Sequence, residues 1–305
     1  MKTIIIPPIK SQGIKTKLVP WINNLILRSD IDIQHANWIE PFLGTGIVAF
    51  NTPICGKRIL GDTNPHIINF YKEVKDGTIT PYKMRAYLEK ANKLFLSSEE
   101  NGYAYYRQVR ESFNQYHSPY DFIVLSRSGF NGMMRFNKQG EWNVPFCKKA
   151  NRFSPAYITK ICNQLQKVQE EMLYHKWELY NEPFTETIQK AQVGDLIYCD
   201  PPYYGRYTDY YNGWEEKEEK ALYDALKRTP AYFILSTWHH NEYRENKMIK
   251  QIWREYNIET RKHFYHNGGH IENRHAMVEA LIFNFHLHAE TKKKMEETTL
   301  FSLQV

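Results

Sequence analysis

The chain has 305 residues, 42% of them hydrophobic and 24% charged, and these proportions exclude a disordered or fibrous protein. No apolar run approaches the roughly 18 residues of a membrane span, and the apolar stretch near the start is too short for a secretory signal, so we expect a cytoplasmic protein without membrane contacts. A formal net charge of +6 favours polyanionic partners only mildly.

The first half of the chain alternates strand and helix patterns. Residues 37–50 predict a short strand, a glycine turn and the start of a helix. Residues 57–62 predict a second strand that ends in an acid. Helical periodicity follows over 65–74, 81–96 and 101–116.

In residues 127–146, two glycine-bearing turns separate short aromatic runs, which predicts a β-hairpin or an ordered loop. A helix is expected over 156–173. Residues 195–200 form an apolar run of the buried parallel-strand type that stops at two prolines. Later strands are expected at 231–237 and 279–285, with a charged, solvated helix around 215–228 between them.

Strands near both ends with helices between them predict an α/β sheet interrupted by an inserted subdomain. We expect residues 1–74 and 181–305 to form the core. The insertion is expected to span residues 75–180 and to contain the 127–146 hairpin.

The sequence EPFLGTG at 40–46 places Gly44 and Gly46 where a strand turns into a helix, so that backbone can approach a nucleotide-like ligand. Residues 44–49 also satisfy the G-x-G-x-x-A pattern, which leaves a nicotinamide-dependent dehydrogenase open. Asp62, at the end of the next expected strand, is suited to accept hydrogen bonds from ribose hydroxyls. Its structural alternative is a helix N-cap.

Asp200, Pro201, Pro202 and Tyr203 follow a strand and therefore lie at the carboxyl edge of the expected sheet. An aromatic amine is a poor nucleophile because its lone pair is delocalised into the ring. The Asp200 carboxylate and the Pro201 carbonyl are able to accept its two N–H groups and to stabilise the charge that grows as nitrogen attacks a sulfonium methyl group. Tyr203 is suited to stack on a base that has left the duplex.

Together these motifs resemble the Dam-type, D12-class adenine-specific DNA methyltransferases, in which the cofactor motif precedes the target-recognition region and DPPY follows it. The resemblance implies a Rossmann-like sheet that uses S-adenosylmethionine to methylate N6 of a flipped-out adenine in double-stranded DNA. Residues 10–15 look like the family's K-W-x-G-G-K motif, with Lys15 as its second lysine. Two positions depart from that motif, because Ser11 replaces tryptophan and Ile14 replaces glycine.

The resemblance also implies the residues of each site. Those of the catalytic loop are Asp200, Pro201, Pro202 and Tyr203. Those around the cofactor are Ser11, Lys15, Glu40, Phe42, Gly44, Gly46, Asp62, Glu182 and Asp200.

Residues 127–146 are similar to the family's R-x-x-x-N-G-x-x-R-x-N…G-E-F-N-V-P-F element, which reads DNA. A cation such as Arg135 is able to grip guanine, and an apolar side chain such as Phe130 or Met133 to fill the space that a flipped base vacates. The implied DNA contacts are Arg127, Phe130, Asn131, Met133, Arg135 and Asn137. We expect a short G-A-T-containing site, a prokaryotic, phage or viral origin, and a companion restriction endonuclease.

Several alternatives stay open at this point. One alternative is cytosine N4 as the methyl acceptor, and another is RNA as the substrate. A third is a DNA-binding relative that has lost catalysis. No metal is expected, because the cysteines form no C-x-x-C pair and the histidines around 263–275 lack the spacing of a metal site. Those histidines predict a basic loop instead.

Overall fold

The computed structural model describes residues 3–205, 214–264 and 276–288. Its strands form one sheet in the order β3-β2-β1-β4-β5-β7-β6. Their bounds are β1 (Trp38–Glu40), β2 (Arg58–Gly61), β3 (Trp177–Tyr180), β4 (Leu196–Cys199), β5 (Tyr232–His240), β6 (Asn257–Phe264) and β7 (Ala276–Phe283). Strand β7 is antiparallel to β5 and β6, and the other pairs are parallel. This mainly parallel sheet confirms the expected α/β, Rossmann-like fold.

Helices cover both faces of the sheet. Side chains along a strand alternate between the faces, and apolar side chains on each face are buried under helices. Leu196 and Tyr198 of β4 belong to one core, and Ile197 and Cys199 to the other. The first core takes in helices α1 (Val19–Leu27) and α2 (Pro65–Lys75). The second takes in α7 (Phe184–Gln189), α8 (Glu216–Arg228) and α9 (Lys247–Gln251). The buried apolar run that predicted β4 therefore reflects burial on both faces.

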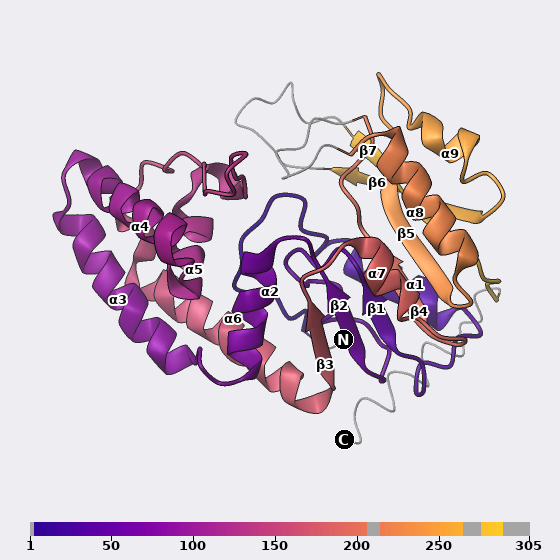
Figure 1. Ribbon diagram of the computed structural model, residues 1–305, viewed down its shortest axis with the longest axis horizontal. Helices are drawn as coiled ribbons and strands as arrows, with labels where there is room; N and C mark the ends of the chain where they lie inside the picture. The colour runs from indigo at the N-terminus through magenta and orange to yellow at the C-terminus, as the bar shows by residue number, and fades with distance from the viewer. Residues whose placement is uncertain (1–2, 206–213, 265–275, 289–305) are drawn as a thin grey trace.

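A group of helices lies to one side of the sheet (Figure 1). It consists of α3 (Pro81–Ser97), α4 (Tyr103–Tyr116), α5 (Pro119–Ser128) and α6 (Pro155–Tyr174), with short 3-10 turns at η1 (Glu100–Gly102), η2 (Phe130–Gly132) and η3 (Ala150–Phe153). The helices expected at 65–74, 81–96 and 156–173 are confirmed within one or two residues. The Asn64 and Thr80 side chains cap the first turns of α2 and α3.

The loop 129–146 is ordered but is not a regular hairpin. It contains η2 and two isolated bridges, which join Gly129 to Phe146 and Phe136 to Trp142. The Trp142 indole N–H donates to Tyr106 Oη at 3.1 Å, and this contact fixes the loop to α4. Arg127 lies in helix α5, before the loop begins.

Strand β3 moves the expected domain boundary. Its residues pair with β2 from Arg58 and Trp177 to Gly61 and Tyr180. Residues 177–180, which the sequence analysis assigned to the insertion, are thus part of the core sheet, and we draw the boundary before Trp177.

The sheet reverses its strand order between β1 and β4, which are adjacent and parallel. Ile39 pairs with Ile197, so the segments that follow both strands leave the same edge of the sheet. The carboxyl edge at such a reversal is where open α/β sheets bind their ligands. The EPFLGTG turn and the Asp200 loop meet there.

Candidate active site

The glycine turn after β1 is joined to the end of β2 by Asp62. The Gly44 amide donates to Asp62 Oδ2 at 2.8 Å, and the Asn64 amide donates to Oδ1 at 2.8 Å. Gly44 and Gly46 have φ angles of 50° and 73°, which disfavour a side chain. A Cβ on Gly44 would meet no atom within 4 Å. Open space therefore lies beside this turn and next to a carboxylate that retains acceptor capacity.

The surroundings of Asp62 in this turn affect the pKa of its carboxyl. Burial raises its pKa, although the hydrogen bonds from Asn64 and Gly44 oppose that shift. Hydrogen bonds from the hydroxyl groups of a ribose would favour the ionised form of Asp62 further.

Phe42 belongs to an aromatic cluster that the sequence analysis did not predict. Its ring stacks on that of Phe184 with centroids 5.2 Å apart, and Trp214 meets the two rings at 5.6 and 5.7 Å. The three rings come from the turn after β1, the start of α7 and the approach to α8. They form an apolar surface beside the glycine turn, of the kind that contacts a purine ring.

Glu219 of helix α8 holds Trp214 in this cluster. Its Oε2 accepts the Trp214 indole N–H at 2.6 Å, and its Oε1 accepts the Trp253 indole N–H at 2.8 Å. Only 2% of Glu219 is exposed, so the prediction of a solvated helix face is wrong at this residue. Because its neighbours in the sequence are charged, the sequence analysis did not identify Glu219 as a buried hydrogen-bond acceptor.

Asp200, which is half-buried, forms an ion pair with the buried Lys15. The Lys15 Nζ lies 2.9 Å from Asp200 Oδ2 and also donates to the Gly13 carbonyl at 3.3 Å. The second oxygen of Asp200, Oδ1, is buried and has no hydrogen-bond partner within the described residues. A buried acceptor without a donor is costly, which favours a ligand that brings an N–H group to it.

The same surroundings set the charge of Asp200. Burial raises the pKa of its carboxyl, and the Lys15 ammonium opposes part of that rise. The ion pair therefore keeps the carboxylate more ionised than burial alone would.

The rest of the DPPY loop is tied to strands β5 and β7. The Tyr203 hydroxyl donates to Glu279 Oε2 at 2.6 Å, and Lys15 Nζ lies 4.9 Å from the centroid of its ring. The Trp238 indole N–H donates to the Tyr204 carbonyl at 2.9 Å. The loop is thus held at Asp200, Tyr203 and Tyr204.

Glu40 adds a second buried carboxyl at this edge. Its Oε2 accepts the Trp38 indole N–H at 2.9 Å, and 2% of the residue is exposed. Burial raises the pKa of Glu40 well above its usual range, and the nearby Asp200 charge raises it further. Two carboxyls at neighbouring strand ends favour a ligand with positive charge. The acids, the Asp62 turn and the aromatic rings together suit a ligand that carries a positive charge, a ribose and a purine.

Two other predicted cofactor residues have internal partners. Ser11 Oγ donates to the Gln12 carbonyl at 3.2 Å. Glu182 Oε1 accepts from the Thr187 hydroxyl at 2.7 Å and lies 3.1 Å from Lys190 Nζ. Their cofactor contacts stay predictions from the resemblance.

The predicted DNA contacts in loop 129–146 differ in exposure. Phe130 is 47% exposed, and the neighbouring Asn131 is exposed with a left-handed φ of 51°. Met133 is half-buried against the main core. Arg135 donates through Nε and Nη2 to the Asn143 carbonyl, at 2.9 and 2.7 Å. Asn137 closes its own turn, because its side chain binds the amide and the carboxylate of Glu141.

Arg127 does not face solvent. Only 5% of it is exposed, and its guanidinium donates to Pro8 O, Tyr157 Oη and Gln164 Oε1 at 2.6, 3.1 and 2.6 Å. All three of its nitrogens are engaged inside the protein. We therefore remove Arg127 from the predicted DNA-contacting residues and assign it a structural role.

Loop 129–146 touches the segments that carry the predicted cofactor residues. Gln12 Nε2 donates to the Asn131 carbonyl at 3.5 Å, and Asn64 Nδ2 donates to Met134 Sδ at 3.3 Å. Loop 129–146 therefore contacts both the N-terminal motif and the turn that carries Asp62.

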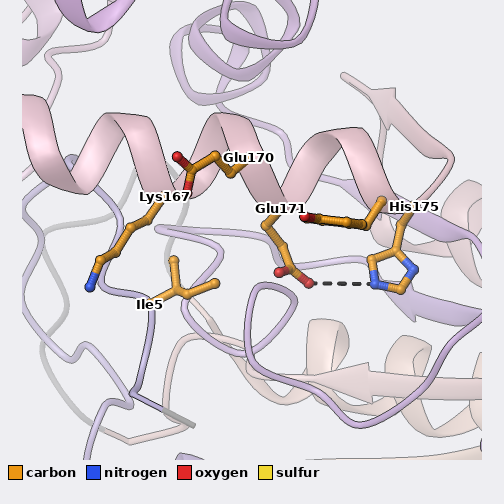
Figure 2. A pocket seen from close by; sticks show the side chains of 6 residues that line it. Ile5, Lys167, Glu170, Glu171 and His175 are labelled. Atoms are coloured by element: carbon orange, nitrogen blue, oxygen red, sulfur yellow. Dashed lines mark ion pairs between the residues drawn. The ribbon is translucent and has the colours of Figure 1, made fainter. Parts of the chain in front are cut away.

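A hollow of about 380 Å³ lies elsewhere, between Ile5 and helix α6. Figure 2 shows Lys167, Glu170 and Glu171 projecting from that helix and His175 just after its end, with Glu171 paired to His175 at 3.4 Å. None of the predicted site residues lines it.

Two further predictions concern absences. In the described ranges, no group of three or more metal-ligating side chains is placed to hold an ion, and His266, His270 and His275 lie outside those ranges. None of the helices described is long and apolar enough to cross a membrane.

Comparison with known proteins assigns the family. The family model of the D12 class N6 adenine-specific DNA methyltransferases matches residues 11–267, which include the glycine turn, loop 129–146 and DPPY. The chain belongs to this family. By membership it is an adenine-specific DNA methyltransferase, and adenine N6 rather than cytosine N4 is the acceptor.

Similar proteins come from bacteria. A DNA adenine methylase of Vibrio cholerae is 32% identical over 201 residues, which cover 63% of this chain and 67% of that protein. A DNA adenine methylase of Escherichia coli K12 is 34% identical over 175 residues, 54% of this chain and 55% of that protein. A retron Ec67 DNA adenine methylase of Escherichia coli is 30% identical over 197 residues, 62% of this chain and 63% of that protein. The D12-class assignment replaces the dehydrogenase alternative.

Proposed function

We propose that this chain transfers a methyl group from S-adenosylmethionine to N6 of an adenine flipped out of duplex DNA, with Asp200 and the Pro201 carbonyl as acceptors of the amine. The supporting observation is the Lys15–Asp200 ion pair, which leaves the buried Asp200 Oδ1 unpartnered beside the glycine turn.

We assign the cofactor to the space beside Gly44. Asp62 accepts the ribose hydroxyls, the Phe42 cluster contacts the adenine ring, and Glu40 lies toward the cationic end. When bound, S-adenosylmethionine supplies a methyl group activated by its sulfonium. Gly46 and Glu182 complete the set that the family motif implies.

Asp200 Oδ1 accepts one N–H of the target amine, and the Pro201 carbonyl accepts the other. These two acceptors draw the nitrogen lone pair out of conjugation and stabilise the positive charge that grows on it. Pro202 stiffens the loop, because its φ is fixed. The Tyr203 ring stacks on the base, and its hydroxyl bond to Glu279 orients the ring.

On the DNA side, Phe130 is the exposed wedge that fills the space left by the flipped base, and Arg135 grips a guanine. Asn131 and Met133 contact the flanking bases, and Asn137 keeps the loop in shape. A short G-A-T-containing site, a companion restriction endonuclease, and a cytoplasmic location in a prokaryotic or virus-infected cell are the accompanying expectations.

Methylation-aware sequencing of DNA from methylase-deficient bacteria that express the chain tests this function. We expect N6-methyladenine in one short motif that contains G-A-T. Unmodified adenine throughout, in cells that contain folded protein, would contradict the proposal.

Trp214→Ala is expected to weaken cofactor binding about 2- to 10-fold, because an aromatic contact contributes roughly 0.5–1.5 kcal/mol beyond the area it buries. Glu219→Gln should weaken it less, because an amide oxygen still accepts one of the two indole N–H groups. Calorimetric titration with S-adenosylmethionine measures both. Tyr223→Phe, which changes the same helix outside the cluster, is the control; equal affinity in Trp214→Ala and wild type would exclude Trp214 from the pocket.

Arg135→Ala is expected to lower kcat/KM on the preferred site by roughly 10- to 100-fold, since a bidentate contact to guanine discriminates by about 1–3 kcal/mol. On sites in which the contacted guanine is replaced, kcat/KM of Arg135→Ala should differ little from that of the wild type. Steady-state methylation of matched and altered duplexes measures the ratio. An equal loss on every duplex would mean that Arg135 does not read a base.

A further inference from the structure

Three cations surround Tyr157 next to loop 129–146, and we call Lys10, Arg127 and Arg152 the cationic cluster. The guanidinium carbons of Arg127 and Arg152 lie 5.6 and 4.9 Å from the centroid of the Tyr157 ring. Arg152 Nε donates to the Arg127 carbonyl at 2.7 Å. Lys10 packs against Gly132, where a Cβ would stand 3.0 Å from Lys10 Cε. The cluster thus connects the N-terminal motif to the loop.

The cluster has unused donors. Arg127 spends its nitrogens on internal acceptors, whereas Lys10 Nζ and the terminal nitrogens of Arg152 contact no acceptor in the part of the chain that the structure describes. Lys10 and Arg152 are both half-buried. No described carboxylate forms an ion pair with any member of the cluster. Positive charge that is partly removed from water and lacks a counter-charge is costly, and an external anion would offset that cost.

Two titratable groups register the positive potential. Burial lowers the pKa of Lys10, and the charges of Arg152 and Arg127 lower it further. Burial alone would raise the pKa of Tyr157, but Arg127 and then Arg152 outweigh that effect and lower it.

Helix α6 adds to this potential. It is 20 residues long and begins at Pro155, next to Tyr157, and its N-cap Ser154 makes no side-chain hydrogen bond to the first turn. The positive end of a helix dipole with uncapped amides favours an anion. The helix end and the cations therefore act in the same direction.

We propose that Lys10 and Arg152 of the cationic cluster bind one phosphate of the DNA backbone, while loop 129–146 engages the bases. This inference rests on the proposed function. Arg127 is a positioning residue, because it holds Tyr157 and supplies the carbonyl that orients Arg152. The segment that carries Lys10 also carries Lys15, the partner of Asp200. A bound phosphate would therefore fix the strand relative to the active site.

Salt dependence tests the phosphate contact. Binding of a fluorescein-labelled duplex to the cofactor-loaded protein is measured by anisotropy over a range of KCl. We expect Arg152→Gln and Lys10→Gln each to reduce the slope of log Kd against log salt by about 1, and to leave the preference between matched and altered sites unchanged. Arg152→Lys should keep the slope. Lys167→Gln, which removes an exposed cation from the same helix at the hollow of Figure 2, is the control.

A charge-free backbone identifies the phosphate. Duplexes with a single methylphosphonate at each position in turn should weaken binding of the wild type at one position near the site, and Arg152→Gln should be insensitive to that same substitution. The inference would be overturned if Arg152→Gln lost as much affinity as the wild type for every methylphosphonate duplex. A wild-type salt slope in Arg152→Gln would overturn it as well. Absence of adenine methylation by the wild type would instead contradict the proposed function.

Discussion

Asp200→Ala is expected to reduce kcat by about 10³-fold, because removal of one preorganised acceptor of developing charge costs roughly 10²- to 10³-fold and the loss of charge also disturbs Lys15. Cofactor affinity should change by much less, since Asp62, the glycine turn and the Phe42 cluster remain. Labelled methyl transfer under single-turnover conditions measures kcat, and calorimetry measures cofactor binding.

Asp195→Asn is the matched control for that substitution. Asp195 is also buried next to β4, but at its opposite end, where it accepts hydrogen bonds from Asn37 and Gln192. We expect it to alter stability and to leave kcat within a few-fold of wild type. Full methyl transfer by folded Asp200→Ala would remove Asp200 from the mechanism.

Lys15→Met is expected to move the acid limb of the kcat profile to higher pH. In the proposed mechanism the carboxylate of Asp200 must be ionised, so we expect activity to be lost as pH falls through its pKa, which burial raises and Lys15 partly lowers. Without the ammonium that pKa rises further. At a fixed pH below it, kcat should fall about tenfold for each unit of the difference. The measurement is kcat between pH 5 and 9 at saturating cofactor and DNA.

Lys15→Arg separates charge from structure, because it keeps a cation beside Asp200. We expect it to restore the acid limb toward that of the wild type. A Lys15→Met profile that is merely scaled down, with its limb unmoved, would mean that Lys15 acts on the cofactor or on folding rather than on Asp200.

The sheet was largely predictable because its strands carry strong local signals. The apolar run before Pro201 and the glycine turn after Glu40 each predict a strand end, and parallel pairing brings both to one edge. Helix α5 was missed because it is buried along almost its whole length, from Asp121 to Ser128, and therefore lacks an amphipathic period. Strand β3 was missed because, unlike β4, it has no continuous buried apolar run: Trp177 and Leu179 are buried, but Glu178 separates them.

The positions of Asp62 and Asp200 at strand ends were predictable because each follows a recognisable strand, whereas their roles toward cofactor and base stay predictions. The site was not predictable where a contact joins distant segments. Arg127 lies in a segment whose family resemblance predicts DNA contacts, yet its partners include Pro8 and Gln164, and only the fold shows that it is buried. Glu219 lies in a charge-rich helix, and its two tryptophan partners are likewise known only from the fold.

The account depends most on the acceptor geometry at Asp200, and a crystal structure with sinefungin and a duplex that contains the target site tests it directly. We predict an extruded adenine whose N6 lies about 2.7–3.2 Å from both Asp200 Oδ1 and the Pro201 carbonyl, with its ring on Tyr203. A flipped adenine bound elsewhere, or one whose amine meets neither oxygen, would contradict it.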